Sequence, residues 1–457
     1  MAPRPRPPSR APSRKGVAVL VLAAGQGKRL PGALPKVLIE CLGLPLLEWV
    51  RRAIVPLAPA HVVLVVGHGR EAVTSWAHVA WPDAAPVVQE PQHGTGHAAR
   101  LAMAALPSTF VGDVVVVYGD VPQLEASDLQ ALLSHHRATK AAATVLTGTV
   151  ADAGRLGRVV RAGNGRFARI VEASDASAVE LALGELNTGI YAFDAQALRP
   201  ALENLPRDNA QREEYLTDAV HAIAASGGAV ETVSAAEPAA LLGVNTRADL
   251  AAAFRALRAR VATRLLDSGV AIVDPDTTVV EADVEIAPGA RILPFTFIGH
   301  GCRVGADCVV GPFAHLRGGT VLEAGAQVGN FVEVKASILK AGAKAKHLAY
   351  LGDADVGEGA NVGCGAVTAN FDGTKKHRTR IGARARIGSG TILVAPVSVG
   401  EGAITGANAV VLANADVSPG ETVVGVPARP IRRAPSASAV GGATGRATGR
   451  AAKQRSR

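Results

Sequence analysis

An aliphatic residue recurs at every sixth position through much of the C-terminal half of the chain. The unbroken run comprises Val280, Ile286, Ile292, Ile298, Val304, Val310, Leu316, Leu322, Val328 and Val334. The period resumes at Ile381, Ile387, Leu393 and Val399, misses at Thr405, and returns at Val411, Val417 and Val423. A period of six fits neither an α-helix nor an alternating strand, but it is typical of a parallel β-helix made of short strands and turns. We expect the aliphatic side chains to point into the prism and small residues to form its corners.

We expect this β-helix to cover residues 270–433. A single coil of such a prism cannot bury its own face, and the flat sides of the stack favour packing against a neighbour. The sequence therefore predicts side-by-side association of several copies, and we expect a homotrimer around a threefold axis.

The first half of the chain shows a different pattern, in which aliphatic runs alternate with amphipathic stretches. VAVLVL (17–22), HVVLVVG (61–67) and DVVVVYGD (113–120) are continuous apolar runs. Such runs are typical of strands that are buried on both faces. They predict an α/β domain with a parallel sheet covered by helices over residues 16–245.

A helix is predicted between the two halves. Residues 246–268 contain no Gly or Pro, and Thr246 with Asp249 matches a capped helix start. Apolar residues follow at helical spacing, namely Leu250, Phe254, Leu257, Val261 and Leu265. We therefore expect a linker helix over residues 246–269.

The net charge of +9 is concentrated at the two ends of the chain. Residues 1–15 and 429–457 carry 13 Lys and Arg and no acid, which leaves 35 basic against 39 acidic side chains, or −4, for the rest. We expect basic, disordered segments at 1–15 and 434–457, and no specific nucleic-acid partner for the folded body.

Cysteine usage and hydropathy indicate a location inside the cell. Cys41, Cys302, Cys308 and Cys364 form no C-x-x-C pair, so we expect buried thiols without disulfides. No apolar run reaches the roughly 18 residues of a membrane helix. VAVLVLAAG (17–25) is interpreted as a strand rather than as a signal peptide. We expect a cytoplasmic protein that has no membrane partner.

The segment LAAGQGKRLPGALPKVL (22–38) follows the first predicted strand. Its small residues allow a nucleotide to approach the backbone, and Lys28, Arg29 and Lys36 can face the phosphates. The segment is neither a Walker A loop nor a G-x-G-x-x-G motif. From the residues alone, it is an anion-binding loop or a plain glycine-rich turn. His93 and His97 have the spacing of a zinc pair, but the GTG between them favours a backbone-lined loop instead.

The pattern LAAGxGxR…PK resembles the signature of the sugar-phosphate nucleotidyltransferases, which have a Rossmann-like fold. Seven further segments agree with it: QHGTGHA (92–98), YGDVP (118–122), GRVVR (157–161), IVEASDA (170–176), ELNTGIY (185–191), REEYLTD (212–218) and GVNT (243–246). Together with the six-residue repeat, the chain from about 16 to 430 resembles the bifunctional N-acetylglucosamine-1-phosphate uridyltransferase / glucosamine-1-phosphate acetyltransferase family. The resemblance implies a nucleotidyltransferase domain followed by a left-handed parallel β-helix.

The same resemblance implies a site for UTP and a sugar phosphate in the first domain. The residues implied to hold the nucleotide or lie beside it are Leu22, Ala23, Ala24, Gly25, Gln89, Gly94, Thr95, Tyr118, Gly119 and Asp120. Those implied to hold the sugar phosphate are Gly157, Glu172, Asn187 and Asn245. The resemblance also implies that Asp120 and Asn245 bind Mg²⁺ and that Arg29 and Lys36 act in catalysis. A sugar phosphate is already ionised at pH 7, so this reaction needs alignment and charge neutralisation rather than a strong base. Lys28 stands where the family usually has Thr.

Residues 335–380 break the six-residue period and concentrate polar side chains that a bare coil does not need. These are Lys335, His347, Tyr350, Asn361, Asn370, Lys375 and Lys376. Breaks in a repeat often mark function. From the residues alone, the stretch is a second site or a solvated loop.

Five segments are similar to the acetyltransferase half of the same family: RGG (317–319), GNFVEVK (329–335), KHLAYLGDA (346–354), NVGCGAVTANFDG (361–373) and GSGTILVAPVSVG (388–400). The similarity implies that Arg317, Lys335, Tyr350 and Asn361 bind the sugar phosphate. It implies that His347 removes a proton from the glucosamine ammonium, a role that suits an imidazole because it is largely neutral at pH 7. The freed amine would attack acetyl-CoA, with Asn370 and a backbone N–H near Ser389 stabilising the oxyanion.

The coenzyme would lie between subunits, against Asn370, Phe371, Ser389, Ala407 and Arg429. Two positions depart from the family pattern: Phe371 replaces a usual Tyr, and Gly425 replaces an Arg found in some members. Our hypothesis is that Arg429, Arg432 or Arg433 contacts the coenzyme phosphate instead.

Three functions remain open on the sequence. The first is a bifunctional enzyme that acetylates glucosamine-1-phosphate and then uridylylates the product to UDP-N-acetylglucosamine. The second is a nucleotidyltransferase whose β-helix is only structural, and the third is a nucleic-acid or surface-binding protein that uses its basic ends. His347 and the residues around it favour the first, because a structural coil has no use for them.

Overall fold

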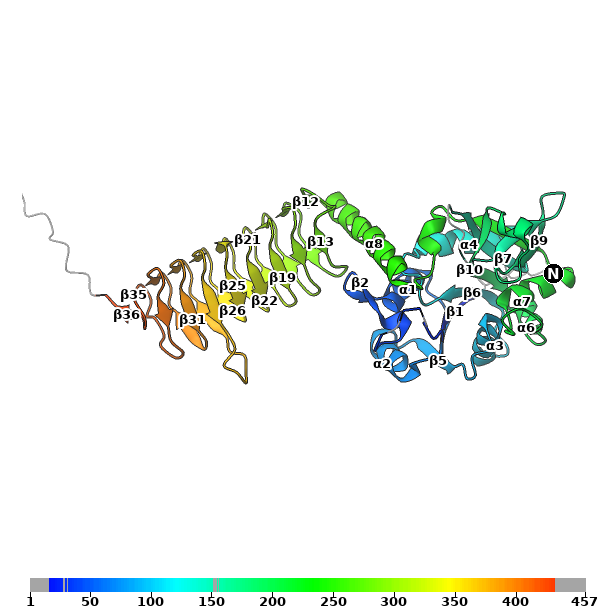
Figure 1. Cartoon of the computed structure of the whole chain (residues 1–457), viewed down its shortest axis with the longest axis horizontal. Coiled ribbons are helices and arrows are strands. Elements are labelled where there is room, and N and C mark those ends of the chain that lie inside the picture. Colours follow the sequence, from blue (N-terminus) through cyan, green and yellow to red (C-terminus); the bar gives the residue numbers. More distant parts are fainter. Residues whose placement is uncertain (1–15, 28, 31, 151–153, 155, 432–457) are drawn as a thin grey trace, which may run out of the picture. The chain divides into compact units, whose positions relative to one another are not determined.

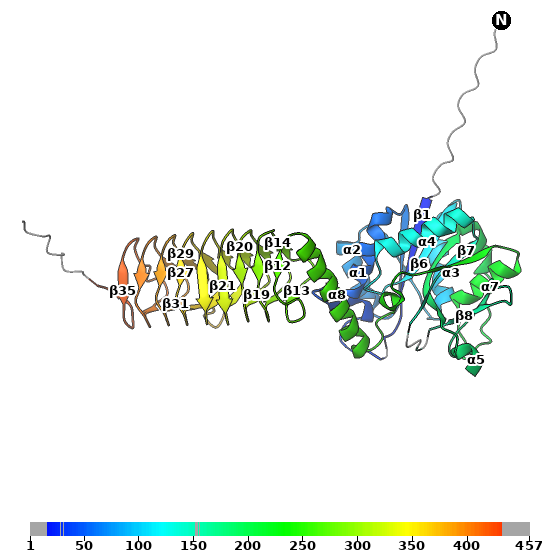
Figure 2. The same ribbon diagram turned by 90° about the horizontal axis from the view of Figure 1, so that it is seen from above.

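The computed structural model describes residues 16–27, 29–30, 32–150, 154 and 156–431. The described residues divide into two compact units, which are drawn in Figures 1 and 2. The first unit runs to Glu285 and also takes in Ile298–Gly301, and the second comprises Ile286–Phe297 and the residues from Cys302 onward. The expected disordered segments 1–15 and 434–457, as well as Lys28, Arg432 and Arg433, lie outside the described residues.

A nine-stranded mixed sheet forms the centre of the first unit, with β11-β7-β10-β6-β1-β4-β5 as its main path. The strands are β1 (Gly16–Ala23), β4 (His61–Val66), β5 (Ala84–Val88), β6 (Gly112–Tyr118), β7 (Ala143–Thr149), β10 (Glu185–Asp194) and β11 (Val230–Ser234). Strands β8 (Arg158–Arg161) and β9 (Phe167–Val171) attach beside β10. Strand β1 is parallel to β4 and β6, whereas β10 runs antiparallel to β6 and β7. The three apolar runs that predict buried strands are β1, β4 and β6.

Helices cover both faces of this sheet. They are α1 (Leu46–Ile54), α2 (Arg70–Ala80), α3 (Thr95–Ala105), α4 (Ala126–Thr139), α5 (Ala178–Leu181), α6 (Ala195–Ala201) and α7 (Leu216–Ala225). Short 3₁₀ turns lie at η1 (Lys36–Leu38), η2 (Val55–Leu57) and η3 (Pro238–Leu241), and β2 (Glu40–Cys41) pairs with β3 (Leu44–Pro45).

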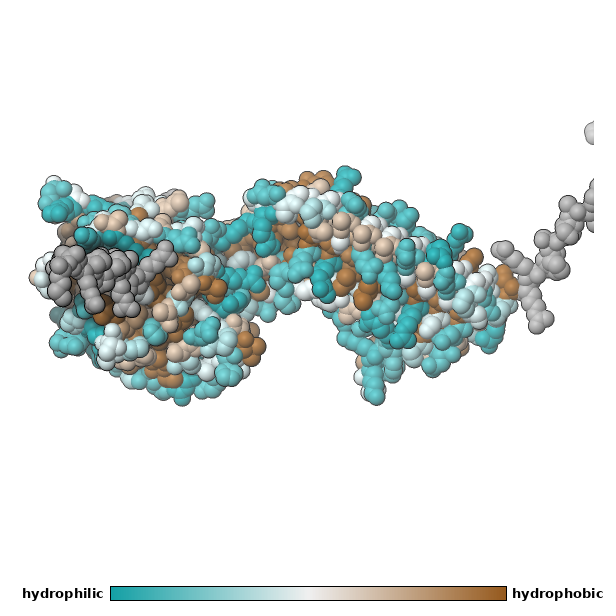
Figure 3. Space-filling view, turned by 180° about the vertical axis from the view of Figure 1, so that it is seen from behind, coloured by the Kyte–Doolittle hydropathy of each residue, from teal (hydrophilic) through white to brown (hydrophobic). Residues whose placement is uncertain are grey.

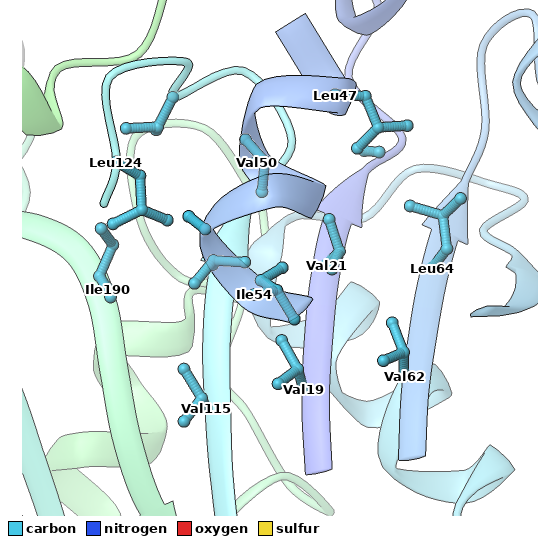
Figure 4. Packing of buried hydrophobic residues seen from close by; sticks show 14 of the residues in the cluster. Val19, Val21, Leu47, Val50, Ile54, Val62, Leu64, Val115, Leu124 and Ile190 are labelled. Atoms are coloured by element: carbon cyan, nitrogen blue, oxygen red, sulfur yellow. The ribbon is translucent and has the colours of Figure 1, made fainter. Parts of the chain in front are cut away.

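Alternate residues of β1 enter two separate hydrophobic cores, one on each face of the sheet. Val19 and Val21 pack against α1, as Figure 4 shows, while Ala18 and Leu20 face the core that contains α3, α6 and α7. Each fully buried Val or Leu contributes about 1.5–3 kcal/mol to the free energy of folding. Burial on both faces is the reason why the strand has no polar residue between Val17 and Leu22.

A helix is present where one is predicted, as α8 (Arg247–Asp267). Thr246 Oγ1 accepts the N–H of Asp249 at 3.1 Å, and Asp249 Oδ2 accepts the N–H of Thr246 at 2.8 Å. This reciprocal pair is a capping box, which satisfies two backbone donors at the helix start. Leu257, Val261 and Leu265 form part of its buried side.

Short strands follow α8 to the end of the described chain. They are β12 (Ala271–Ile272), β13 (Val279–Val280), β14 (Glu285–Ile286), β15 (Arg291–Ile292), β16 (Phe297–Ile298), β17 (Arg303–Val304), β18 (Val309–Val310), β19 (His315–Arg317), β20 (Val321–Leu322), β21 (Gln327–Asn330), β22 (Glu333–Lys335), β23 (Ile338–Leu339), β24 (Lys344–His347), β25 (Tyr350–Gly352), β26 (Ala354–Val356), β27 (Asn361–Val362), β28 (Val367–Ala369), β29 (Thr379–Ile381), β30 (Arg386–Ile387), β31 (Ile392–Val394), β32 (Val397–Val399), β33 (Ile404–Thr405), β34 (Val410–Val411), β35 (Thr422–Val424) and β36 (Arg429–Pro430).

In the second unit these strands stack into three sheets. The first sheet contains β15-β18-β21-β24-β27-β30-β33-β35-β36, the second β19-β22-β25-β28-β31-β34, and the third β17-β20-β23-β26-β29-β32. Except for β35 with β36, the paired strands are parallel, as in β18 with β21 and β19 with β22. The second unit is therefore a parallel β-helix, as the repeat predicts.

The inward direction of the aliphatic repeat is confirmed, since all ten residues from Val280 to Val334 are buried. A second buried position precedes each of them by two residues and carries a side chain that is no larger. It is filled by Thr278, Val284, Ala290, Thr296, Cys302, Cys308, Ala314, Thr320, Ala326 and Val332. The six-residue spacing of Cys302 and Cys308 therefore reflects this inner position.

The expectation of small residues at the corners is wrong at one edge of the prism. Phe295, Phe313 and Phe331 occupy corners between the first and second sheets, with φ values of +58°, +56° and +55°. Their rings stack at centroid distances of 4.8 Å and 5.2 Å. The left-handed backbone of these corners accepts Phe because stacking of the rings offsets part of its conformational cost.

The interpretation of 335–380 as a break in the repeat also needs correction, because the coils continue through it. Val334 pairs with Leu351, and Leu339 pairs with Val356, so these coils are one residue shorter than their neighbours. Only residues 371–378 leave the stack, as a loop between β28 and β29 that projects from the yellow-orange part of the ribbon in Figure 1.

Two features concern the hydropathy of the helices and of the surface. Among the described residues, no helix combines the length and apolarity that crossing a bilayer requires. On the face drawn in Figure 3, hydrophobic and hydrophilic residues are interspersed over both units.

Candidate functional site

The ends of three strands meet at one edge of the sheet in the first unit. Ala24 follows β1 and Asp120 follows β6, which are parallel, and Asn187 lies near the start of the antiparallel β10. The carbonyl of Leu22 accepts the N–H of Gly119 at 2.9 Å, which joins the two loops. Open α/β sheets place their ligands at this edge, beyond the carboxyl ends of the parallel strands.

Three predicted residues from distant parts of the sequence come together here. The ammonium of Lys36 forms an ion pair with Asp120 and lies 3.1 Å from Oδ1 of Asn245. The backbone N–H of Val244 also donates to the Asp120 carbonyl at 2.9 Å, which fixes the segment that carries Asn245. The side chains of Lys36 and Asp120 are only 11% and 14% exposed, so their interaction is largely shielded from solvent.

The oxygens of Asp120 and Asn245 fit a hard divalent cation. Both oxygens converge on the Lys36 ammonium, so they point at one place that already holds a positive charge. One carboxylate and one amide oxygen match the few protein ligands that Mg²⁺ takes when phosphate oxygens and water supply the rest. Within the described ranges, no group of three or more His, Cys, Asp or Glu is arranged to hold a metal.

The segment from Gln89 to His97 forms a closed loop beside β1. Gln89 Nε2 donates to the Gly94 carbonyl at 2.8 Å and lies 3.4 Å from His97 Nδ1. Thr95 Oγ1 accepts the N–H of Leu216 at 3.0 Å. Burial lowers the pKa of His97, so its ring is neutral at pH 7. These contacts agree with the backbone-lined loop and give the zinc interpretation no further ligand among the described residues.

A second group of predicted residues lies where β8, β9 and β10 approach one another. Asn187 donates its N–H to the Gly157 carbonyl at 2.9 Å and its side-chain amide to the Tyr191 hydroxyl at 2.6 Å. Thr217 Oγ1 donates to Glu172 Oε1 at 3.1 Å. Burial raises the pKa of Glu172, because it disfavours the charged carboxylate. Such a carboxyl group is suited to hydrogen bonds with the uncharged hydroxyls of a sugar.

Two residues in this region were missed by sequence reasoning, although both lie inside the quoted motifs. Gln92 Nε2 donates to the carbonyl of Ala24, which ties the 89–97 loop to the loop after β1. Gly189 has φ +81°, and a Cβ there would collide with the ring of Tyr118. The sequence signals that could have identified them are Gln92 in QHGTGHA (92–98) and Gly189 in ELNTGIY (185–191). Arg29 is exposed, and Tyr118 is partly buried, with a pKa that desolvation raises.

A cationic cluster lies on the second sheet of the β-helix. Arg317 of β19 pairs in register with Lys335 of β22, one coil further along. The adjoining ammonium of Lys376 lowers the pKa of Lys335, and the guanidinium of Arg317 adds to this effect. Three positive charges therefore converge on one face, an arrangement that favours a phosphate. Arg317 Nη1 also forms an ion pair with Glu333 Oε1 at 2.8 Å.

Tyr350 and Asn370 lie beside this cluster. A Cβ added at Gly352 would lie 2.5 Å from the Tyr350 hydroxyl and 2.7 Å from Asn370 Nδ2, so both side chains pass over Gly352. Asn370 also donates to Asp353. Since Gly352 pairs in register with Lys335, the hydroxyl and the amide reach the cationic cluster on the same sheet.

The loop of residues 371–378 presents Lys376 to the cluster. Its backbone is held by Asp372, whose Oδ1 accepts the N–H groups of Thr374 and Lys375, each at 2.7 Å. These hydrogen bonds, with that of His377, lower the pKa of Asp372 to about 2, so the loop keeps its shape across neutral pH. Lys376 was missed as a site residue, because nothing in the sequence separated it from Lys375.

His347 and two of the predicted coenzyme residues, Ser389 and Ala407, lie at the edge between the first and second sheets. His347 ends β24 and Tyr350 begins β25, so the corner between them carries both. Further along this edge, the Cys364 carbonyl accepts the N–H of Gly390 at 2.7 Å. The Ser389 carbonyl accepts the N–H of Asn408 at 2.7 Å, which places Ser389 and Ala407 in neighbouring coils.

The remaining predicted residues are placed separately. Asn361 lies on the first sheet, in register with Lys344 and Arg386, whereas Tyr350 lies on the second sheet. Phe371 is 60% exposed on the projecting loop, and Arg429 is exposed on β36.

The expectation of buried thiols is confirmed for three cysteines, and all four are reduced. It is wrong for Cys364, which is exposed because it occupies a corner of the prism rather than the small inner position.

Comparison with known proteins agrees with both parts of the chain. The model of the MobA-like NTP transferase domain matches residues 19–266. The bifunctional protein GlmU of Clavibacter sepedonicus is 41% identical over 91% of this chain and 90% of its own length. Those of Mycolicibacterium gilvum and Streptomyces coelicolor are each 42% identical, over 89% of this chain and 89% and 91% of their own lengths.

These matches extend across the strand edge in the first unit and the cationic cluster in the β-helix, which are the two places where the predicted residues gather. A nucleotidyltransferase with an unrelated structural extension would match its relatives over the first unit alone. By the extent and identity of these matches, the chain belongs to the GlmU family of bifunctional proteins.

Proposed function

We propose that the chain makes UDP-N-acetylglucosamine in two reactions. The β-helix transfers the acetyl group of acetyl-CoA to glucosamine-1-phosphate, and the first unit then transfers uridylate from UTP to N-acetylglucosamine-1-phosphate. One observation carries this proposal: the chain matches bifunctional GlmU proteins over about nine-tenths of both lengths, through both units. The nucleotidyltransferase and acetyltransferase activities therefore have separate sites on one polypeptide.

In the first unit, the sugar-phosphate oxygen attacks the α-phosphorus of UTP and pyrophosphate leaves. The loops after β1 and β5 would hold the nucleotide, and Gly157, Glu172 and Asn187 would hold the sugar. Lys36 and Arg29 would neutralise charge on the phosphates. We propose Asp120 and Asn245 as ligands of Mg²⁺, which when bound supplies further charge neutralisation on the triphosphate.

In the β-helix, Arg317, Lys335 and Tyr350 would hold the sugar phosphate, and His347 would take a proton from its ammonium group. The amine then attacks the thioester carbonyl of acetyl-CoA, the C–S bond breaks, and the CoA thiolate leaves and is protonated. Asn370 would donate to the oxyanion. We propose Asn361 as a further sugar contact, and Phe371, Ser389, Ala407 and Arg429 as contacts of the coenzyme.

We propose domain boundaries at 16–245, 246–269 and 270–433, a cytoplasmic location, and basic ends that bind no specific nucleic acid. We also propose a homotrimer, which the exposed ring stack of Phe295, Phe313 and Phe331 supports.

The experiment that tests the proposal assays the two half-reactions separately on the full chain. With acetyl-CoA and glucosamine-1-phosphate, we expect release of free CoA. With UTP, N-acetylglucosamine-1-phosphate and Mg²⁺, we expect release of pyrophosphate. Pyrophosphate without CoA release would support a nucleotidyltransferase with a structural β-helix, and the bifunctional proposal would be wrong.

The cationic cluster predicts a role for Lys376 in binding the sugar phosphate. We expect Lys376→Ala to raise the KM for glucosamine-1-phosphate about tenfold or more, since a hydrogen bond to a charged group contributes about 1.5–3 kcal/mol. The measurement is CoA release at varied sugar phosphate. Lys375→Ala, on the same loop, is the matched control and should leave this KM unchanged. Equal effects of the two substitutions would contradict the assignment.

The ring stack predicts a surface on which copies of the chain pack. Phe313 is 44% exposed, and its edge continues through Leu348, next to His347. A convex edge cannot enclose a coenzyme, so a neighbouring prism would complete the acetyltransferase site. We expect Phe313→Asn, which tolerates positive φ, to shift the molar mass in light scattering from trimer to monomer. Acetyl transfer should fall with it, while uridylyl transfer persists. Leu412→Asn, at a different corner, is the control, and an unchanged trimer in both variants would refute this surface.

A further inference from the structure

Glu214 is a buried carboxylate held between two arginines from different segments. Its side chain is 6% exposed. Arg100 on α3 donates to Oε2 at 2.8 Å, and Arg207 donates through Nε to Oε1 at 3.0 Å. Burial alone would raise the pKa of Glu214, but the hydrogen bonds from Arg100 and Arg207 outweigh it and hold the pKa below its ordinary value. The carboxylate is therefore ionised at neutral pH and is fixed from two sides.

The backbone around Glu214 holds the loop that contains Gly94 and Thr95. The N–H of Glu214 donates to the His93 carbonyl at 2.7 Å, and its carbonyl accepts the N–H of Gly96 at 2.8 Å. Two residues later, the N–H of Leu216 donates to Thr95 Oγ1 at 3.0 Å. The residues on both sides of Gly94 are thus paired with the segment 214–216.

Gly94 itself passes closely against Glu214. Its φ is +104°, and a Cβ at this position would lie 2.5 Å from the Glu214 carbonyl oxygen. The Gly94 carbonyl in turn accepts the hydrogen bond of Gln89 Nε2. A displacement of Glu214 would therefore be transmitted through Gly94 to the amide of Gln89.

We propose that Glu214 is a positioning residue for the base of UTP, and that with Arg100 and Arg207 it holds the loop of Gln89, Gly94 and Thr95 in the shape that receives this base. The inference rests on the proposed uridylyl transfer. The loop offers an amide, a hydroxyl and backbone groups, which distinguish pyrimidines by hydrogen bonds at the base edge. Loosening the loop therefore weakens nucleotide binding and base discrimination, and leaves the reacting phosphates in place.

The test compares Glu214→Gln with Glu48→Gln in the full chain. Glu48 is a matched control, because its side chain is 9% exposed and also bridges two arginines, Arg51 and Arg52, within α1. For Glu214→Gln we expect the KM for UTP to rise about tenfold while kcat stays within about twofold, which is the pattern of lost binding rather than lost chemistry. We expect the preference for UTP over CTP in kcat/KM to fall by a similar factor.

Two further measurements complete the test. Acetyl transfer, measured on the same sample, should be unchanged in both variants. Arg207→Gln should shift the KM for UTP in the same direction, and it leaves Glu214 paired with Arg100 if Glu214→Gln fails to fold.

An unchanged KM and an unchanged UTP preference in a folded Glu214→Gln protein would overturn the inference, as would equal changes in Glu48→Gln. Absence of uridylyl transfer in the unsubstituted chain would instead overturn the proposed function.

Discussion

Asp120→Asn is expected to reduce uridylyl transfer by about a thousandfold, since charge stabilisation worth several kcal/mol is lost from the transition state. The carboxylate is placed directly after β6, where it pairs with Lys36 and lies beside Asn245. An amide of the same shape keeps the volume but removes the negative charge that would hold a divalent cation and orient the lysine. Pyrophosphate release from UTP, N-acetylglucosamine-1-phosphate and Mg²⁺ is the measurement.

The control for this substitution lies at the opposite end of the same strand. Asp113 is also buried and forms an ion pair with Arg137, but it lies at the start of β6, whereas the candidate site lies beyond the end of this strand. Asp113→Asn should therefore cost stability and retain uridylyl transfer. Full activity in Asp120→Asn, or equal losses in the two variants, would show that Asp120 has no special role.

His347→Ala is expected to reduce acetyl transfer by about 10²–10⁴-fold, the usual contribution of a general base. The amine of glucosamine-1-phosphate is protonated at neutral pH and cannot attack a thioester until it loses a proton. His347 is exposed at the corner between β24 and β25, next to Tyr350, so a substrate can reach it. CoA release is the measurement, and pyrophosphate release in the first reaction should be unaffected.

His315→Ala is the matched control for the β-helix, because His315 is also an exposed histidine on a coil strand. It should retain acetyl transfer. Raising the pH should partly restore the activity of His347→Ala, because the substrate amine then loses its proton without a base. If this activity were not reduced at all at neutral pH, the proposed mechanism would be wrong.

Much of the fold could be predicted because the repeat and the apolar runs consist of residues that are buried in the folded chain. The residue at every sixth position must fill a narrow prism, and it does so from Val280 to Val334. The continuous valines of β6 are buried on both faces, as such a run requires. The start of α8 was predictable because a capping box depends on two residues three positions apart.

The errors arose where tertiary contacts override local pattern. The chain between Lys335 and Arg380 loses its six-residue spacing through coils that are one residue shorter and through one projecting loop, yet the coils stay stacked. Phe313 occupies a corner at positive φ because neighbouring rings stack on it, and those rings are 18 residues away in sequence.

In the candidate sites, some residues could be named from the sequence and others only from tertiary contacts. Family resemblance supplied Asp120, Asn245 and Lys36 as separate positions, and the fold brings their side chains together. Lys376 could not be chosen over Lys375, because only the hydrogen bonds of Asp372 decide which lysine of the loop reaches Lys335. Glu214 lies in the quoted segment REEYLTD (212–218), but its role could not be read from it, because that role depends on two arginines elsewhere in the sequence.

We propose that one chain carries two independent sites whose reactions follow one another. The decisive experiment mixes the Asp120→Asn and His347→Ala proteins with glucosamine-1-phosphate, acetyl-CoA, UTP and Mg²⁺. Neither protein alone should make UDP-N-acetylglucosamine, whereas the mixture should make it, because N-acetylglucosamine-1-phosphate released by one is used by the other. A mixture as inactive as its components would contradict the account.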